Sequence, residues 1–362
     1  MTNIHPTAVI EDGAQIASTA QIGPFCWISS KAKIGENVRL LARVSVMGDT
    51  TIGEGTVVFP GAVLGGGPQD HGNEFQEGAR LVIGKRNVIR ENVTMQCGTP
   101  KGQTPIEGQE PEKLITRVGD DGMFMVNSHI AHDCVVGNNV IMTNNAVIGG
   151  HVRLGDGVIL GGNSAVHQFC RIGRKAMIGG LSGVDRDVIP FGIVTGDRGK
   201  LRGLNVIGLK RSGYDEATVK SITRAFMFIF KGKNGTFESR VAEAHEKFKD
   251  NPMVMEQIKF IDEALRGRRN VMVAEFSRRH RHYPFRSLCL LHRPLRPARI
   301  RFQLPDQQRP PRFRQIVAVD DNAVQIGLRA LRTQHVCHHA VNGVLQRLRD
   351  LPTGQSGLHD LW

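Results

Sequence analysis

Residues 118–154 read VGDDGM FMVNSH IAHDCV VGNNVI MTNNAV IGGHVR L when the chain is divided into sixes, and every six begins with an apolar side chain. The same period runs from Ile4 to Leu64, from Ile83 to Met95 and from Val118 to Val184. An α-helix has a period of 3.6 residues and a β-strand a period of 2, so neither element alone explains this repeat. A solenoid does, because each six can form one flat side of a coil with its apolar residue pointing to the axis.

Glycine, asparagine and aspartate are frequent between the apolar residues. These residue types adopt tight-turn backbone angles at little energetic cost, as the corners of a coil require. Three sixes make one coil of 18 residues, and stacked coils pair as parallel strands about 4.8 Å apart. The predicted fold class is therefore an all-β solenoid, a parallel β-helix. An ordinary β-sandwich would show alternation with a period of two and irregular turn spacing instead.

Two interruptions of the repeat predict loops that leave the solenoid. The apolar spacing lengthens to 19 residues after Leu64 and to 23 residues after Met95, and neither number is a multiple of six. We expect extruded loops near residues 65–82 and 96–117, within a β-helix that spans residues 1–190. Loops on a rigid scaffold often carry function, although a tolerated insertion explains either loop equally well.

Beyond residue 190 the period of six gives way to helical periods. Asp215 and Thr236 can each cap a helix, and Pro252 suits the first turn of a third helix. The apolar residues expected to face inward are Val219, Ile222, Phe226 and Ile229, then Val241, Ala244 and Phe248, and finally Met255, Ile258, Ile261 and Leu265. The sequence therefore predicts a helical cap domain over residues 191–276.

The net charge of +13 is unevenly distributed. Residues 277–362 contain 15 Arg, no Lys, 5 Asp and no Glu, so this Arg-rich tail carries +10 of the total. A basic arm that binds nucleic acid is one interpretation. We instead expect a frameshift or a fused unrelated reading frame, because Arg, Pro, His, Leu and Gln without Lys or Glu are typical of a GC-rich gene read in the wrong frame. A genuine basic tail is the alternative; in either case we expect poor order and no nucleic-acid partner.

The remaining composition predicts a cytoplasmic protein. The six cysteines show no CxxC pair and no metal-ligand spacing, so we expect reduced thiols. The N-terminal sequence MTNIHPTAV lacks the basic and apolar regions of a signal peptide. No apolar stretch approaches the ~20 residues that a transmembrane helix needs.

The repeat also predicts which distant residues are neighbours. Three apolar residues spaced by 18 lie on the same side of successive coils: Ile130, Ile148 and Val166. A histidine follows each of them within three residues: His132, His151 and His167. These three histidines should share one column, with His129 at the corner of the same side. Asp133 is adjacent to His132, and Gly150 lies one coil above it.

This cluster predicts a catalytic or ligand-binding site. A neutral histidine is a good general base near neutral pH, and acyl transfer to a hydroxyl needs such a base and a donor for the developing oxyanion. His132 can supply the base, and the backbone N–H of Gly150, unshielded by a side chain, can supply the donor. No Ser in a G-x-S-x-G context is present, which favours direct transfer without an acyl-enzyme.

Other interpretations of the histidine column stay open. It could be a ladder of polar side chains on a solvated face, without activity. It could also bind zinc, as in the γ class of carbonic anhydrases, but no carboxylate or Cys completes an obvious four-ligand set. We therefore expect no metal and no cofactor.

Four segments resemble one family of enzymes. They are NSHIAHDC at 127–134, NNAVIGGHV at 144–152, AVHQFCRIG at 165–173 and NVIGLKR at 205–211. Together they resemble the UDP-N-acetylglucosamine O-acyltransferases of lipid A synthesis, and the likeness extends from about residue 3 to about residue 268. The resemblance implies a left-handed β-helix followed by a small helical domain, and a homotrimer with sites between subunits. It also implies transfer of an (R)-3-hydroxyacyl group from acyl carrier protein to the sugar 3-position, with the acidic carrier docking on basic residues near the cap.

The resemblance assigns roles to the residues of the column and the first loop. His132 would be the general base, with Asp133 tuning it, and Gly150 would be the oxyanion donor. Gln69 and Asp70 would bind the sugar and reach across a subunit boundary.

It assigns further binding roles as well. The residues that would line the groove for the sugar and the acyl chain are His129, His151, His167 and Gln168. Asn205 and Arg211 would contact the nucleotide, Arg211 through phosphate. Gly180 occupies the position at which a side chain limits the length of the acyl groove in the family. Because glycine has no side chain, we expect a long acyl chain.

Several positions depart from the family pattern. The segment that begins at His71 lacks a Lys that helps hold the substrate in many family members. Gln96 occupies a position at which the family often has a His. Ile207 replaces a usual Glu near the uridine, and Ser212 replaces a second Arg. These changes leave a UDP 3-amino sugar open as an alternative acceptor, since an amine also needs a base and the same donor.

Two rival functions complete the predictions. The N-acyltransferase of the same pathway shares the β-helix, but it usually has an additional N-terminal domain for which this chain, with repeats from Ile4, leaves no room. A non-catalytic β-helix that binds sugar would take up the nucleotide sugar without turnover.

Overall fold

The structure, a computed structural model, describes residues 3–72, 76–104 and 111–266. The described residues belong to one compact unit. The Arg-rich tail of residues 277–362, predicted to be frameshifted or poorly ordered, lies outside them. No helix in the described part of the chain has the length and apolarity that a bilayer crossing requires.

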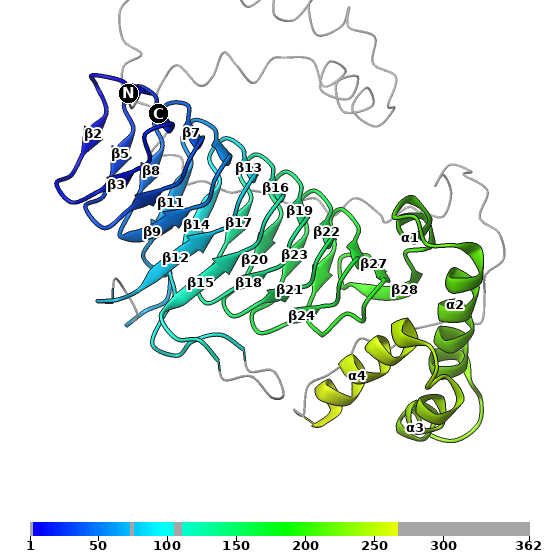
Figure 1. The fold of residues 1–362 in the computed structure, drawn as a ribbon. Helices are drawn as coiled ribbons and strands as arrows, with labels where there is room; N and C mark the ends of the chain where they lie inside the picture. Colours follow the sequence, from blue (N-terminus) through cyan, green and yellow to red (C-terminus); the bar gives the residue numbers. More distant parts are fainter. Residues whose placement is uncertain (1–2, 73–75, 105–110, 267–362) are drawn as a thin grey trace, which may run out of the picture. The chain divides into compact units, whose positions relative to one another are not determined.

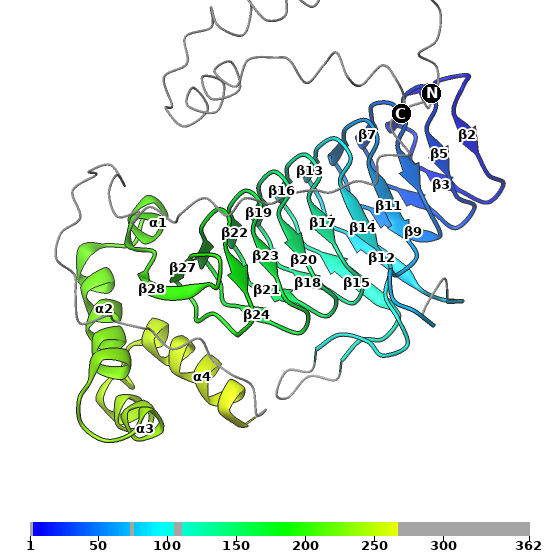
Figure 2. The same cartoon turned by 180° about the vertical axis from the view of Figure 1, so that it is seen from behind.

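The strands form three sheets, to which successive strands contribute in rotation (Figures 1 and 2). The first sheet contains β1 (Asn3–Ile4), β4 (Gln21–Ile22), β7 (Arg39–Leu40), β10 (Val57–Val58), β13 (Val88–Ile89), β16 (Met123–Phe124), β19 (Ile141–Met142), β22 (Ile159–Leu160), β25 (Met177–Ile178), β27 (Gly192–Thr195) and β28 (Lys200–Leu204). The second contains β2 (Val9–Ile10), β5 (Trp27–Ile28), β8 (Ser45–Val46), β11 (Val63–Gly66), β14 (Thr94–Gln96), β17 (His129–Ile130), β20 (Val147–Ile148), β23 (Ala165–Val166) and β26 (Gly183–Val184). The third contains β3 (Gln15–Ile16), β6 (Lys33–Ile34), β9 (Asp49–Ile52), β12 (Arg80–Ile83), β15 (Ile115–Val118), β18 (Val135–Val136), β21 (Arg153–Leu154) and β24 (Arg171–Ile172).

Strand pairing follows the predicted coil. His129 pairs with Val147, and Val147 pairs with Ala165, each in parallel and one coil further along the chain. The architecture is a left-handed parallel β-helix, as predicted. The first sheet continues beyond residue 190, where a helical cap was expected: β27 pairs in parallel with β25, and β28 pairs with β27 in antiparallel orientation.

The apolar residue that begins each six forms the core. Ile148 and Leu160 are completely buried, and the same is true of most positions of the series. The first coil has no coil below it, so Ile4 remains 37% exposed. Because each coil buries its apolar residues mainly against its neighbours, the hydrophobic contribution to stability is distributed along the stack.

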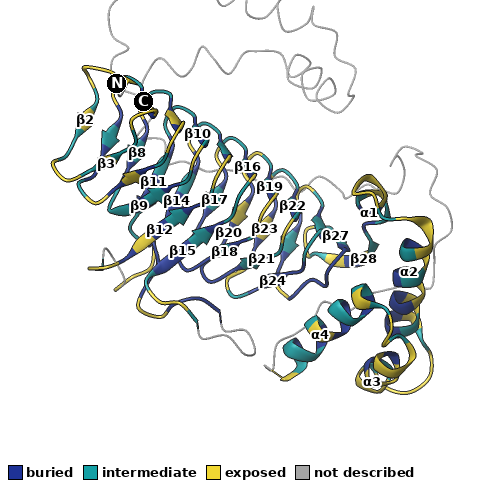
Figure 3. Cartoon of the chain, in the orientation of Figure 1, coloured by how far each residue is buried: buried dark blue, intermediate teal, exposed yellow. Residues whose placement is uncertain are grey.

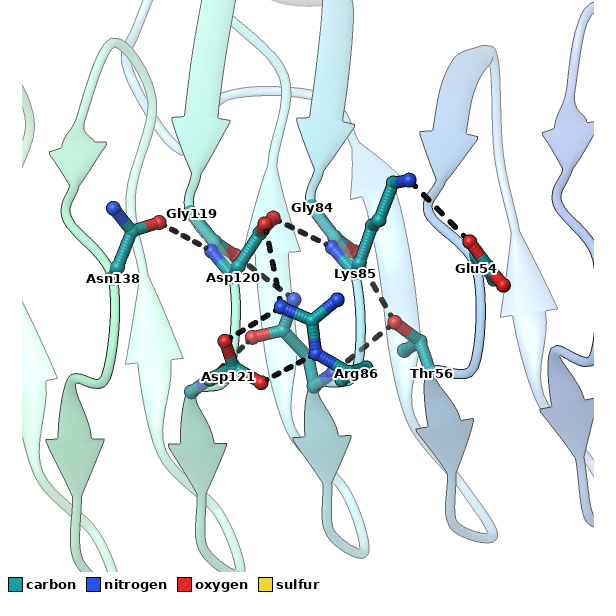
Figure 4. A network of polar contacts seen from close by, with 11 residues as sticks. Glu54, Thr56, Gly84, Lys85, Arg86, Gly119, Asp120, Asp121 and Asn138 are labelled. Carbon is teal, nitrogen blue, oxygen red and sulfur yellow. Dashed lines mark hydrogen bonds and ion pairs between the residues drawn. The ribbon is translucent and has the colours of Figure 1, made fainter.

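Polar ladders connect the coils at their corners. Where the chain turns from the third sheet to the first, the Lys85 N–H donates to Oδ1 of Asp120 at 2.8 Å, and the Asp120 N–H donates to Oδ1 of Asn138 at 2.8 Å (Figure 4). A Cβ on Gly84 would lie 2.1 Å from that Asp120 oxygen. Glycine after the apolar residue is therefore required by the close approach of the next coil.

Both insertions leave the β-helix where the chain turns from the second sheet to the third, between β11 and β12 and between β14 and β15. We call this turn the second–third corner. The sheet register continues across both insertions, since Ile52 pairs with Ile83 and Ile83 pairs with Val118. Both insertions extend from the same corner.

Four helices follow the strands in the described part of the chain: α1 (Val206–Arg211), α2 (Glu216–Lys231), α3 (Phe237–Lys247) and α4 (Pro252–Arg266). Asp215 and Thr236 cap α2 and α3 through their side chains, and α4 begins at Pro252, as predicted. The short α1 was not predicted. The buried and exposed sides of α2 and α4 are distinct in Figure 3, but three residues predicted to face inward, Phe248, Met255 and Leu265, are only partly buried.

An ionic network joins α4 to the last coils. The Arg171 guanidinium donates to Asp187 and to Glu263 of α4, both at 2.8 Å. The same guanidinium lies 4.3 Å from the ring centroid of Phe260. Because Arg171 is almost fully buried, these partners replace the water that a charged group otherwise needs.

Candidate active site

A groove of about 540 Å³ runs along the second–third corner. It is lined by residues from four successive coils and from both insertions: Gln69, Asp70, Gln96, Lys101, His129, Ala131, His132, Val147, Ile148, Gly149, Gly150, His151, Val166, His167 and Gln168. The register of the repeat places the histidines here, since they lie on or just after strands of the second sheet. His129 is a strand residue of β17 rather than the corner residue that we expected.

His132 and Asp133 form a hydrogen-bonded pair. Nδ1 of His132 lies 2.9 Å from Oδ2 of Asp133, whose side chain is completely buried. An ionised carboxylate only accepts hydrogen bonds, so Nδ1 carries the proton in this pair. Nε2 is thereby left as the basic atom of the ring, and the His132 side chain lines the groove with 11% of its surface exposed.

Gly150 packs directly against His132. A Cβ atom on Gly150 would lie 2.5 Å from Cε1 and 2.6 Å from Nε2 of the ring. The neighbouring amides are engaged, because Gly149 N–H donates to Val166 and His151 N–H donates to the His132 carbonyl. Within the described residues no backbone acceptor takes the Gly150 N–H. The arrangement presents a base and an amide donor side by side in the groove.

His151 is held by the second insertion. Its Nδ1 lies 2.7 Å from the carbonyl oxygen of Gly102, and the hydroxyl of Thr104 donates to the His151 carbonyl at 2.6 Å. The ring stacks on Phe169 with centroids 4.4 Å apart. Burial lowers the pKa of His151 below its ordinary value, so His151 is neutral at pH 7.

The pKa of His129 is also lowered, as is that of His151. Nδ1 of His129 lies 2.7 Å from the hydroxyl of Thr94, one coil below. Burial is the main cause that lowers its pKa, and the charge that His132 can carry adds to the effect. The groove therefore holds two imidazoles with lowered pKa beside His132, and a neutral imidazole can both donate and accept hydrogen bonds.

Gln69 and Asp70 reach this groove from the first insertion, and His167 and Gln168 line its next coil. His167 and Gln168 are exposed. The predicted site residues of the second–third corner thus lie together within a single chain.

Three other predicted site residues lie elsewhere. Gly180 follows β25, at the turn from the first sheet to the second. Asn205 caps α1 and donates to the carbonyl of Lys175, which is at the turn from the third sheet to the first. Arg211 is the exposed last residue of α1. One chain therefore distributes the predicted site over all three corners of the β-helix.

The zinc interpretation can be tested against the same geometry. Among the described residues, His132, Asp133 and His151 offer ligand atoms within 4.8 Å of one another. However, Nδ1 of His132 points to Asp133, Nδ1 of His151 to Gly102, and both Asp133 oxygens accept from Thr99. Both Nδ1 atoms and both carboxylate oxygens of this set are therefore already engaged in hydrogen bonds within the described residues.

The sequence analysis missed the residues of the second insertion that hold the pair. Thr99 donates to Asp133 through both its N–H and its hydroxyl, and Lys101 lines the groove with Nζ 4.7 Å from the Phe169 centroid. One sequence signal could have found them: both insertions interrupt the repeat at the corner that carries the histidines.

Comparison with known proteins identifies the relatives of this chain. The family profile described as "Udp N-acetylglucosamine O-acyltransferase; Domain 2" matches residues 187–269, and the bacterial transferase hexapeptide profile matches residues 31–66. The acyl-[acyl-carrier-protein]–UDP-N-acetylglucosamine O-acyltransferase of Rhizobium johnstonii is 46% identical over 260 residues, which cover 71% of this chain and 90% of that protein. The enzyme of the same name from Caulobacter vibrioides is 47% identical over 259 residues, covering 72% and 94%.

Solved structures give the same result. The crystal structure of UDP-N-acetylglucosamine O-acyltransferase from Moraxella catarrhalis matches with a TM-score of 0.67 and 34% identity, covering 75% of this chain and 99% of that one. The matches include both the β-helix and the helices that follow. This chain therefore belongs to the family of UDP-N-acetylglucosamine O-acyltransferases.

Proposed function

We propose that this chain transfers an (R)-3-hydroxyacyl group from acyl carrier protein to the 3-hydroxyl of UDP-N-acetylglucosamine, the first step of lipid A synthesis. Family membership supports the reaction. The observation that carries the mechanism is the His132–Asp133 pair beside Gly150, in a groove reached by both insertions.

In this mechanism the sugar is the nucleophile. Nε2 of His132 removes the proton of the 3-hydroxyl as its oxygen attacks the thioester carbonyl, and Asp133 stabilises the imidazolium that forms. The Gly150 N–H donates to the oxyanion of the tetrahedral intermediate. As the C–S bond breaks, the imidazolium returns the proton to the thiolate of the carrier's prosthetic group. No acyl-enzyme is formed.

Binding roles follow from position. Gln69, Asp70, His129, His151, His167 and Gln168 line the groove and are proposed to hold the sugar and the proximal acyl chain. Gly180 is proposed to leave room for a long acyl chain, and Asn205 with Arg211 to contact the nucleotide. The carrier is proposed to dock on the basic residues near the helical cap.

We further propose a homotrimer in the cytoplasm, with each site built between subunits. This proposal is supported by the distribution of Gly180, Asn205 and Arg211 over corners other than that of His132. Neighbouring copies could bring these residues to one groove. Sedimentation should give the mass of three chains. Co-expressed His132→Ala and Arg211→Ala chains should regain activity in mixed oligomers if the two residues come from different subunits.

The central experiment measures acyl transfer from 3-hydroxyacyl carrier protein to UDP-N-acetylglucosamine. His132→Ala should lower kcat by roughly 10²–10⁴, the usual contribution of a general base. His245→Ala, which changes an exposed histidine of α3, is the matched control and should leave kcat unchanged. A chain that ends at Phe276 should be fully active. Binding of the nucleotide sugar without turnover by the wild-type chain would instead support a non-catalytic sugar-binding protein.

A second candidate acceptor, the UDP 3-amino sugar, is favoured by one observation. The side-chain oxygen of Gln96 is buried without a hydrogen-bond partner among the described residues, and Gln96 lines the groove. A buried carbonyl without a donor costs about 1–3 kcal/mol. A hydroxyl nucleophile gives its only proton to His132, whereas an amine has a second N–H, which could donate a hydrogen bond to the side-chain oxygen of a reoriented Gln96.

Competition between the two acceptors tests this candidate. Wild-type enzyme is given equal concentrations of UDP-N-acetylglucosamine and its 3-amino analogue, and the comparison is repeated with Gln96→His. Preference for the amine that declines in the variant would support the candidate, and the same preference in both proteins would exclude a role for Gln96.

A further inference from the structure

Thr99 lies against the carboxylate of Asp133 from outside the repeat. Its N–H donates to Oδ1 at 2.8 Å, and its hydroxyl donates to Oδ2 at 2.6 Å. Oδ2 is the same oxygen that accepts from Nδ1 of His132 at 2.9 Å. Thr99 and Asp133 are both almost completely buried, so water does not compete for these bonds.

The backbone of Asp133 is fixed as well. It adopts a left-handed conformation with φ of +57°, and its N–H donates to the hydroxyl of Thr116 at 2.8 Å. With its backbone fixed from one side and its carboxylate from the other, Asp133 can meet His132 in one orientation only. The hydrogen bond at Nδ1 then fixes the direction in which Nε2 of His132 points.

Thr99 also shapes the insertion, since its carbonyl accepts from the Leu114 N–H at 2.8 Å and its hydroxyl accepts from the Lys101 N–H at 3.3 Å, but it is not a position of the six-residue repeat. It belongs to the second insertion, and the sheets pair across that insertion through Ile83 and Val118. A threonine that served only the solenoid would occupy a position of the repeat. Here the side chain instead reaches the one carboxylate that contacts the candidate base.

Two donors on one oxygen have an electrostatic consequence. A hydrogen bond from the Thr99 hydroxyl disperses negative charge on Oδ2, so this oxygen attracts the Nδ1 proton of His132 less strongly. Removal of the hydroxyl would concentrate the charge, favour the imidazolium and free the carboxylate to turn. The rate and its pH dependence would both change.

We propose that Thr99 is a positioning residue for the acyl transfer, which orients His132 through Asp133 and limits the pull of the carboxylate on the Nδ1 proton. This inference rests on the proposed role of His132 as the base.

The test compares Thr99→Val with Thr99→Ser. Valine keeps the shape and the backbone N–H but lacks the hydroxyl, and serine retains the hydroxyl. Thr99→Val should lower kcat about 10- to 100-fold, because a misplacement of about 1 Å in a catalytic group can cost about 10²-fold, with little change in KM. It should also move the acidic limb of the pH–rate profile to higher pH. Thr99→Ser should restore both properties.

The outcomes separate this inference from the proposed function. If His132→Ala is inactive while Thr99→Val has the wild-type kcat and pH profile, even with a lower melting temperature, Thr99 has a structural role only and the inference is wrong. If His132→Ala is fully active, the proposed role of His132 as the general base fails, and if the wild-type chain binds the nucleotide sugar without turnover, the proposed function fails. Should Thr99→Val not fold, Thr99→Ala removes the same hydroxyl without placing a methyl group against the carboxylate, and the same two readouts decide.

Discussion

A Cβ atom on Gly150 would lie 2.5 Å from Cε1 of His132, closer than carbon atoms pack in proteins. The absence of a side chain at this position is therefore what allows the imidazole to occupy the groove. Because the backbone of Gly150 needs no positive φ, the requirement for glycine here is steric and does not come from the turn.

Gly150→Ala should displace the His132 ring and lower kcat roughly 10²-fold, the effect expected when a catalytic group moves by about 1 Å. Gly162→Ala is the matched control. It changes a turn glycine at another corner, where the nearest atom to a new Cβ is 3.6 Å away. The assay is acyl transfer with both proteins shown to be folded by circular dichroism. Equal activities of the two variants would contradict the steric argument.

Stability should decrease on mild acidification because of the buried histidines. Burial lowers the pKa of His129 and His151 in the folded chain, while the unfolded chain has histidines of pKa ~6.5. As the pH falls below ~6.5, the unfolded state binds protons that these two folded imidazoles cannot, so the free energy of unfolding decreases until the pH passes below the folded values.

His151→Gln should make this decrease less steep, because a glutamine cannot be protonated. The melting temperature is measured between about pH 8 and pH 5 for both proteins. The same slope in wild type and variant would mean that other groups dominate the pH dependence.

Equal substitutions at two levels of the stack should have unequal effects. Ile148→Ala removes a completely buried side chain and should cost about 2–5 kcal/mol. Ile4→Ala changes a repeat residue of the first coil, on the first sheet, which is 37% exposed, so its cost should be clearly smaller. Chemical denaturation of both variants gives the two values, and a cost for Ile4→Ala as large as that for Ile148→Ala would exclude this account of the core.

The attachment of α4 should depend on Arg171. Arg171→Leu leaves Asp187 and Glu263 without their shared cation in a buried setting, which should cost about 3–5 kcal/mol. Arg86→Leu removes an arginine that pairs with Asp121 on an exposed corner and should hardly change the melting temperature. Similar losses in the two variants would show that burial of the network is unimportant.

The sequence alone determined the β-helix, its register and the neighbourhood of His132 and Gly150. A repeat of six fixes which residues lie one coil apart, because each coil must align its apolar residues with those of the next. The helix starts at Glu216, Phe237 and Pro252 were predicted for a related reason, since caps and apolar periods are local signals.

Only the tertiary structure decided how the site is held. Thr99 and Gly102 belong to an insertion without repeat, so no register could place them against Asp133 and His151. The hydrogen bond from Arg171 to Glu263 likewise joins a residue of the six-residue repeat to a residue of a helix, and neither period predicts that they meet. A repeat propagates its geometry along the chain, whereas an inserted loop acquires its geometry from the surface on which it packs, and that surface exists only after the coils have formed.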